Sequence, residues 1–169
     1  ENLTPRELVR DLNECFSAFD KITEKYGIEK IKTIGDAYMV AAGLNAASRH
    51  PTESLVDMAL EMCRLLHHDF SINEMHLELR IGIGTGPVVA GVVGKKKFIY
   101  DLWGDTVNTA SRMESHGLPS RVHVSEATVA ALAGRFEIEA RGEIDVKGKG
   151  LMATYFLVRE PARAAEVAP

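Results

Sequence analysis

The sequence predicts an α+β domain in which helices alternate with a largely antiparallel sheet. Apolar residues recur at helical spacing between Leu8 and Ile22, as expected for a helix that covers a sheet. From Leu77 to Ile83 apolar and polar residues alternate, which indicates a half-buried strand. Several further short apolar segments are separated by turn residues. A chain of 169 residues is long enough for one such domain with a proper core.

In the first half of the chain, Thr4, Pro5 and Glu7 form the pattern of a capping box with proline at the first helical position. We expect this helix to end at Gly27. Residues 28–33 and 38–42 predict two strands joined as a hairpin around Gly35 and Asp36. A second helix is predicted from Pro51 to Phe70.

In the second half, residues 88–93 and 98–103 predict an antiparallel pair of strands. Lys95, Lys96 and Lys97 lie between them, and we interpret them as a solvated turn. Beyond residue 115 we expect a strand at 121–124, a helix at 126–133 and strands at 136–139 and 154–158, followed by a frayed tail at 161–169.

Composition limits the classes of function. The hydrophobic fraction of 46% and the charged fraction of 26% are typical of a soluble globular protein, and a net charge of −4 argues against nucleic-acid binding. Cys15 and Cys63 are expected to be reduced core thiols. We find no signal peptide and no apolar run of about 20 residues, so we expect a cytoplasmic domain without direct membrane contact, although an anchor upstream would leave no trace here.

The segment from Phe98 to Arg112 carries the strongest chemical signal. Gly104 separates an aromatic strand from a helix that Asp105 or Thr106 would cap. Asn108 and Arg112 are four residues apart, so they share one helix face and suit an anionic oxygen. An ordinary capped helix with surface Asn and Arg is the alternative. The second face of this helix, fit for a core, consists of Val107, Ala110 and Met113.

Three blocks, IKTIGDAYMV (31–40), YDLWGDTVNTASRMES (100–115) and VKGKG (146–150), resemble the catalytic domain of the class III nucleotidyl cyclases, in particular the bacterial homodimeric adenylyl cyclase type. The resemblance extends from about Leu3 to Arg159. It implies a ferredoxin-like core of βαββαβ type with a hairpin dimerisation arm and a small C-terminal α/β subdomain. We therefore expect a catalytic domain at 1–160 and a disordered tail at 161–169.

The resemblance implies that Lys32 and Asp101 read the purine. Adenine offers a ring-nitrogen acceptor and an amino donor, which a Lys donor and an Asp acceptor complement, whereas guanine presents the reverse. Guanylyl-type members carry Glu and Cys, or a similar small residue, at these two positions. If Asp101 does not lie near Lys32, the lysine is a plain exposed strand residue.

The same resemblance assigns the phosphate and ribose contacts. Asn108 would place the ribose, Arg112 would meet charge on the α-phosphate, and Lys147 would grip the β- and γ-phosphates. Lys149 is a weaker candidate for the phosphates, because glycine-spaced lysines are common in exposed turns. The residues that would line the purine pocket, or alternatively only pack the core, are Leu102, Trp103 and Val107.

Asp36 resembles the second of two aspartates that hold two Mg²⁺ or Mn²⁺ ions per site, although an Asp after Gly is also a common turn residue. The first of these aspartates belongs to a Phe-Ala-Asp-Ile type strand that precedes the point where this sequence starts. We therefore expect the chain as given to lack its first strand and to be inactive. The histidines show no zinc spacing and are expected to be exposed; they are His50, His67, His68, His76, His116 and His123.

Together these observations predict an adenylyl cyclase that converts ATP to 3′,5′-cyclic AMP and pyrophosphate by metal-assisted attack of the 3′-hydroxyl on the α-phosphate. The resemblance implies a head-to-tail homodimer with sites shared between the subunits. Two alternatives remain open. One is a guanylyl or mixed-specificity cyclase, and the other is an inactive cyclase-like domain that only binds nucleotide or dimerises.

Overall fold

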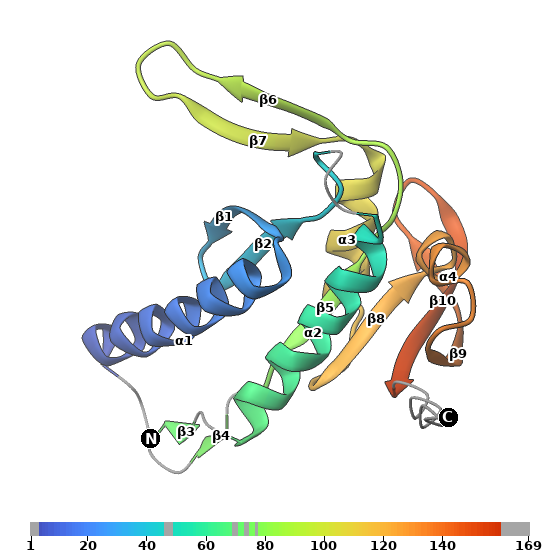
Figure 1. Ribbon diagram of the computed structural model, residues 1–169, viewed down its shortest axis with the longest axis horizontal. Helices are drawn as coiled ribbons and strands as arrows, with labels where there is room; N and C mark the ends of the chain where they lie inside the picture. The colour runs from blue at the N-terminus through green and yellow to red at the C-terminus, as the bar shows by residue number, and fades with distance from the viewer. Residues whose placement is uncertain (1–3, 46–48, 69–70, 73–74, 77, 160–169) are drawn as a thin grey trace, which may run out of the picture. The chain divides into compact units, whose positions relative to one another are not determined.

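The computed structural model describes residues 4–45, 49–68, 71–72, 75–76 and 78–159. Figure 1 shows the path of the chain. It divides into two compact units, Glu1–Leu79 with Ala90–Leu102 and Arg80–Val89 with Trp103–Pro169. The predicted tail at 161–169 lies outside the described residues. None of the described helices is both long enough and apolar enough to cross a membrane.

The first unit begins with helix α1 (Pro5–Tyr26), whose two ends are as predicted. The Thr4 Oγ1 accepts a bond from the Glu7 N–H at 3.3 Å, and a Glu7 carboxylate oxygen accepts from the Thr4 N–H at 2.9 Å, which completes the capping box. Gly27 ends the helix in the left-handed region with φ of 64°.

Helix α1 packs against helix α2 (Pro51–His68) and strand β1 (Glu29–Ile34). Its buried stripe differs from the predicted one, because Leu8 is 47% exposed and the stripe begins at Asp11, which is 7% exposed. Cys15 is buried, Cys63 is half-buried, and both are free thiols as predicted. The apolar residues buried on the two helices are Cys15, Phe19 and Ile22 on α1 and Val56, Met58, Ala59, Met62 and Leu66 on α2.

Two predicted hairpins are confirmed. Strand β1 pairs antiparallel with β2 (Ala37–Ala41) around the turn at Gly35 and Asp36. Strands β6 (Val89–Val93) and β7 (Ile99–Trp103) form their own two-stranded sheet, with the three lysines in an exposed turn between them. A short additional hairpin of β3 (Ser71–Ile72) and β4 (Met75–His76) was not predicted.

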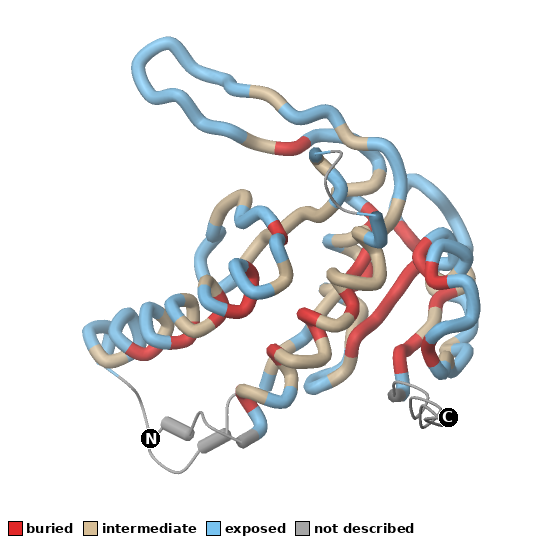
Figure 2. The backbone as a smooth tube through the Cα atoms, viewed as in Figure 1, coloured by how far each residue is buried: buried red, intermediate tan, exposed pale blue. Residues whose placement is uncertain are grey.

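The second unit contains a four-stranded sheet in the order β5-β8-β10-β9, in which only β5 and β8 run parallel. Helix α3 (Asp105–Ser115) packs on β5 and β8, and helix α4 (Glu126–Leu132) packs on β8 and β10. Figure 2 shows that β8 is almost entirely buried. The strands are β5 (Arg80–Ile83), β8 (Arg121–Ser125), β9 (Glu137–Val146) and β10 (Gly150–Arg159).

Gly82 in β5 and Gly84 just after this strand allow α3 to approach the sheet closely. A Cβ on Gly82 would overlap the backbone of Glu114 and Ala110, and a Cβ on Gly84 would lie 2.9 Å from the Thr106 carbonyl oxygen. Met113 and Thr109 are the residues of α3 that become buried, whereas Val107 and Ala110 are only half-buried. The helix that carries Asn108 and Arg112 is thus fixed by backbone-to-backbone packing.

Several predictions need correction. The strand expected at 136–139 overlaps the longer β9, and the strand expected at 154–158 lies within the longer β10. The two strands pair as one hairpin. Strand β5 starts at Arg80, and residue 77 lies outside the described residues.

His123 is fully buried, contrary to the predicted exposure, while His50 and His67 are exposed. The mixed α+β class is confirmed, but the ferredoxin-like core stays a prediction, since β1 and β2 form a separate two-stranded sheet in the described chain.

Candidate active site

Lys32 and Asp101 lie together in the first unit, although 69 residues separate them in the chain. The Lys32 Nζ forms an ion pair with Asp101 Oδ2, and the Leu102 N–H donates to Asp101 Oδ1 at 2.8 Å. Both side chains are largely covered, with exposed fractions of 32% and 15%. The bond from Lys32, followed by that from the Leu102 N–H, lowers the pKa of Asp101. A cationic donor and an anionic acceptor therefore lie side by side, so the condition for the alternative, a Lys32 distant from Asp101, is not met.

A β-bulge shapes the strand that carries Lys32. The register of β1 against β2 shifts between Lys30, which pairs with Val40, and Lys32, which pairs with Met39. Such an extra residue bends a strand and re-aims its side chains. The two lysines accordingly bind different carboxylates, Asp101 for Lys32 and Asp20 of α1 for Lys30.

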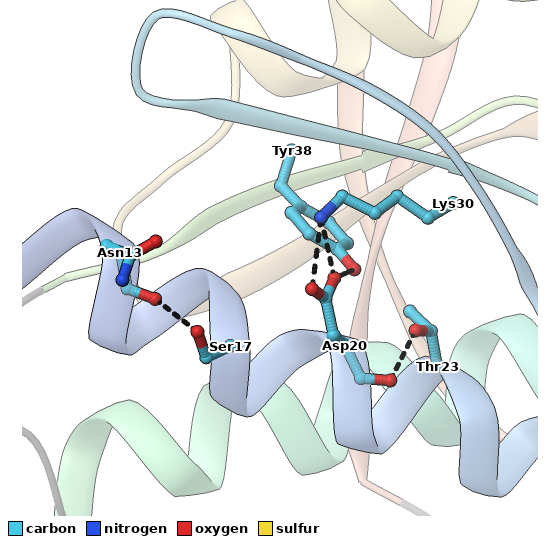
Figure 3. A network of polar contacts seen from close by, with 6 residues as sticks. All are labelled: Asn13, Ser17, Asp20, Thr23, Lys30 and Tyr38. Atoms are coloured by element: carbon cyan, nitrogen blue, oxygen red, sulfur yellow. Dashed lines mark hydrogen bonds and ion pairs between the residues drawn. The ribbon is translucent and has the colours of Figure 1, made fainter.

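The contacts of Asp20 hold the β1–β2 hairpin on α1, as Figure 3 shows. Its carboxylate accepts from the Lys30 Nζ at 2.8 and 3.1 Å and from the Tyr38 hydroxyl at 2.5 Å. The Tyr38 ring packs on Phe16 and Phe19 with centroid distances of 5.4 and 5.5 Å. Burial, reinforced by the bond to Asp20, raises the pKa of Tyr38, whereas the bonds from Lys30 and Tyr38 lower the pKa of Asp20. No sequence spacing pointed to this network.

Asp36 lies in the β1–β2 turn and is exposed. Its carboxylate makes no hydrogen bond or ion pair to any other described residue, so it is available to a hard cation, which prefers oxygen ligands. The described residues contain no group of three His, Cys, Asp or Glu side chains that could hold a metal ion. Asp36 is thus available as a single ligand, and the described residues hold no complete group of three such ligands.

Helix α3 places Asn108 and Arg112 on one face in the second unit. Asn108 is exposed and Arg112 is half-buried, and within the described part of the chain neither side chain makes a hydrogen bond or ion pair. The predicted cap of this helix is wrong, because its N-cap is Gly104, with φ of 138° and no side-chain acceptor. Thr106 instead donates to the Pro87 carbonyl at 2.8 Å. Among the described residues, no side chain therefore caps the N–H groups in the first turn of α3.

The remaining predicted residues fall into different environments. Leu102 is 5% exposed and fits the core-packing alternative, while Trp103 is 40% exposed and Val107 is half-buried. Lys147 is exposed and has no hydrogen-bonding or ionic partner among the described side chains. Lys149, in contrast, forms an ion pair with Asp105, which the sequence did not predict.

The first unit of this mixed α+β chain thus carries the ion pair of Lys32 and Asp101. The second unit carries an amide, a guanidinium and a lysine without polar partners among the described residues. Comparison with known proteins identifies the family. The chain belongs to the adenylate and guanylate cyclase catalytic domain family, which matches residues 1–159.

Its relatives include both kinds of cyclase. Guanylate cyclase soluble subunit beta-2 of Rattus norvegicus is 48% identical over 158 residues, which are 92% of this chain and 23% of that protein. Adenylate cyclase of Mycobacterium tuberculosis (strain ATCC 25618 / H37Rv) is 44% identical over 154 residues, which are 91% of this chain and 35% of that protein. The chain therefore spans only about a quarter to a third of the length of these relatives.

Solved structures agree with this assignment. The guanylate cyclase domain of RhGC from Catenaria anguillulae, in complex with GTP, has a TM-score of 0.89 at 32% identity and covers 95% of this chain and 88% of its own. The catalytic core of a rhodopsin-guanylyl cyclase with converted specificity, in complex with ATPαS, has a TM-score of 0.87 at 34% identity, covering 94% and 86%. Overall similarity therefore does not choose between ATP and GTP.

Proposed function

We propose that this chain is the catalytic domain of an adenylyl cyclase that converts ATP to 3′,5′-cyclic AMP and pyrophosphate in the cytoplasm. The observation that carries the proposal is the pair formed by Lys32 and Asp101. The lysine donates to the ring-nitrogen acceptor of adenine, and the aspartate accepts from its amino group. Guanine presents a ring N–H to the lysine and a carbonyl to the aspartate. Both contacts would then be mismatched, and a buried polar mismatch rejects a substrate strongly.

In the reaction the 3′-hydroxyl oxygen forms a bond to the α-phosphorus, and the bond from that phosphorus to the bridging oxygen of the β-phosphate breaks. Pyrophosphate leaves, and the hydroxyl proton passes to solvent. Asn108 would orient the ribose, and the Arg112 guanidinium would stabilise charge on the α-phosphate in the transition state. Lys147 would bind the β- and γ-phosphates. These three side chains make no polar contact to other described residues, which leaves them available to substrate.

Asp36 would hold the divalent ions, Mg²⁺ or Mn²⁺ and two per site, together with ligands from elsewhere. Such ions, when bound, lower the pKa of a hydroxyl nucleophile and neutralise phosphate charge.

The functional unit we propose is a head-to-tail homodimer in which one subunit supplies Asp36 and the other supplies the base-reading, ribose and phosphate contacts. The exposed apolar surface of the β6–β7 hairpin supports an assembly, because Val92, Phe98 and Ile99 are 58%, 78% and 55% exposed.

The proposal is tested by incubating the purified full-length protein with ATP or GTP in the presence of Mg²⁺ or Mn²⁺ and quantifying cyclic AMP and cyclic GMP. We expect cyclic AMP as the main product. A second candidate, a guanylyl or mixed-specificity cyclase, is favoured by the 48% identity to a guanylate cyclase subunit. Cyclic GMP as the main product would establish it, and the absence of both products would indicate a domain that only binds nucleotide or dimerises.

A further inference from the structure

Lys149 links the turn between β9 and β10 to the first turns of α3. Its Nζ forms an ion pair with Asp105 and donates to Thr109 Oγ1 at 2.9 Å. The Thr109 hydroxyl in turn donates to the Asp105 carbonyl at 3.0 Å, so both partners of Lys149 are joined within the helix. Thr109 is 7% exposed and the Lys149 side chain is 26% exposed, so the bond between these two residues is largely covered, whereas the Asp105 side chain is exposed.

The backbone of the turn holds Lys149 toward the helix. The Lys149 N–H donates to the Val146 carbonyl at 2.8 Å, which closes the turn. Gly148 and Gly150 have φ values of 85° and 75°, which favour glycine on both sides of Lys149. Lys147, two residues earlier, is exposed and makes no polar contact to the described chain. The two lysines of the turn therefore have different environments, one bound to α3 and one open to a ligand.

We propose that Lys149 is a positioning residue, and that it fixes the turn carrying Lys147 against the first turns of the helix carrying Asn108 and Arg112. This inference rests on the proposed function, because the groups so positioned are the proposed phosphate and ribose contacts. The alternative is that Lys149 binds the substrate phosphates directly.

The structure gives a reason why this link affects catalysis more than stability. Because Asp105 is 74% exposed, its ion pair with Lys149 contributes little to the free energy of unfolding. A displacement of about 1 Å in a substrate-positioning group, however, can cost on the order of 100-fold in rate. Loss of the link should therefore reduce kcat and lower the unfolding temperature only by a small, measurable amount.

Charge reversal distinguishes the two roles. We would measure kcat and KM for ATP in two sets of variants of the full-length protein. The first set removes the charges and consists of Lys149→Met, Asp105→Asn and their combination. The second set reverses them and consists of Lys149→Asp alone and Lys149→Asp combined with Asp105→Lys. Lys149→Arg tests whether a conservative change preserves the function, and Lys21→Met, at an exposed position of α1, is the matched control.

For a positioning residue, Lys149→Met and Asp105→Asn each lower kcat about tenfold while KM changes less, and their combination is no worse than the poorer single variant. The reversed pair regains most of the activity lost in Lys149→Asp, and Lys149→Arg stays near wild type. A phosphate ligand behaves in the opposite way. The reversed pair would then be no better than Lys149→Asp alone, Asp105→Asn would be nearly silent, and the inference would be overturned.

A second measurement separates this inference from the proposed function. The unfolding temperatures of the two single variants and their combination report whether Lys149 and Asp105 interact in solution, whatever the protein catalyses. Non-additive shifts support the link even if no cyclic nucleotide is formed, in which case only the proposed function fails. Strictly additive shifts, together with additive losses of kcat, refute the link itself.

Discussion

Lys30 and Lys32 lie two positions apart on β1 and bind carboxylates on different elements, Asp20 of α1 and Asp101 of β7. Residues i and i+2 of a regular strand point to the same face. Here the register shift between the two lysines breaks that rule, because Ile31 has no partner in the ladder with β2. One lysine thereby anchors the hairpin to the helix, and the other is left to the proposed base-reading pair.

The anchor can be tested without altering the proposed site. Tyr38→Phe removes the hydroxyl that donates to Asp20 but keeps the ring that packs on Phe16 and Phe19. We expect the free energy of unfolding to fall by about 0.5–1.5 kcal/mol, as for a typical hydrogen bond. Urea unfolding followed by circular dichroism measures it. Tyr155→Phe, on β10, is the control and should have a smaller effect. Equal losses in the two variants would argue against the anchor.

The base-reading pair makes a prediction about substrate choice. Replacing Lys32 by Glu and Asp101 by Cys removes both complements to adenine. We expect ATP turnover to fall by about 100-fold or more, because a mispaired buried polar site costs several kcal/mol. Turnover of ATP and GTP is measured side by side, with Lys21→Glu, at an exposed position of α1, as the charge-matched control. An unchanged ratio of ATP to GTP turnover in the double variant would refute the role of these two residues.

The capping box, the two hairpins and the helix after Gly104 were predictable because each depends on residues close in sequence. The pairing of Lys32 with Asp101 was predicted only through the family resemblance, since no periodicity relates strands 69 residues apart. The structure then brings the two together. The full length of the β9–β10 hairpin was not predicted, although polar residues alternate with apolar or small ones along β9. The register shift that leaves Arg141 unpaired in the ladder depends on strand pairing, which the sequence does not show.

Tertiary contacts account for the remaining differences. The sequence does not show that the Thr106 hydroxyl donates to the Pro87 carbonyl or that Asp105 forms an ion pair with Lys149. These two contacts occupy the side chains that were expected to cap the helix. Likewise, a histidine in a β-strand gives no sign of burial until its neighbours are known. Metal ligation and subunit arrangement depend on groups beyond the described residues, so they remain proposals.

Gly82 makes a prediction about the support of the candidate site. A Cβ at this position would overlap the backbone of Glu114 and Ala110, and the helix would have to shift from β5. We expect Gly82→Ala to lower the free energy of unfolding by about 1–3 kcal/mol or more, as overpacking does. Arg80→Ala, on the same strand, loses only the exposed ion pair to Glu114 and should cost less than about 1 kcal/mol. Thermal or urea unfolding compares them, and a neutral Gly82→Ala would contradict the close approach of α3.

His123 predicts a pH dependence of stability. Its ring donates from Nδ1 to the Met113 carbonyl at 2.7 Å, Arg141 lies 3.4 Å from Nε2, and the ring stacks on Phe156. Burial is the main cause that lowers the pKa of His123, and the charges of Arg141 and His116 lower it further. The bond to the Met113 carbonyl raises the pKa but does not offset these effects.

The unfolded chain then binds a proton more readily than the folded one. Stability is therefore complete above the unfolded histidine pKa of about 6.5 and declines as the pH falls from there toward the lower folded pKa. We expect the unfolding temperature of the wild type to drop more between pH 7 and pH 5 than that of His123→Gln, which keeps a donor for the carbonyl. Parallel pH profiles for the two proteins would exclude His123 as the source.

The proposed shared site predicts complementation between two inactive variants. Asp36→Ala and Arg112→Ala are prepared separately in the full-length protein, so that each homodimer has two defective sites. Loss of a transition-state donor such as Arg112 should reduce kcat by about 10²–10³-fold. If one site combines Asp36 of one subunit with Arg112 of the other, a mixed dimer contains one site with both defects and one site with neither.

In an equal mixture with free exchange about half of the dimers are mixed, so the activity should return to about a quarter of the wild-type value. It should also depend on total protein concentration, because dimers form by mass action. Mixing each variant with itself is the control. If tagged heterodimers form and no activity returns, the two residues act within one subunit's site, and the head-to-tail arrangement is wrong.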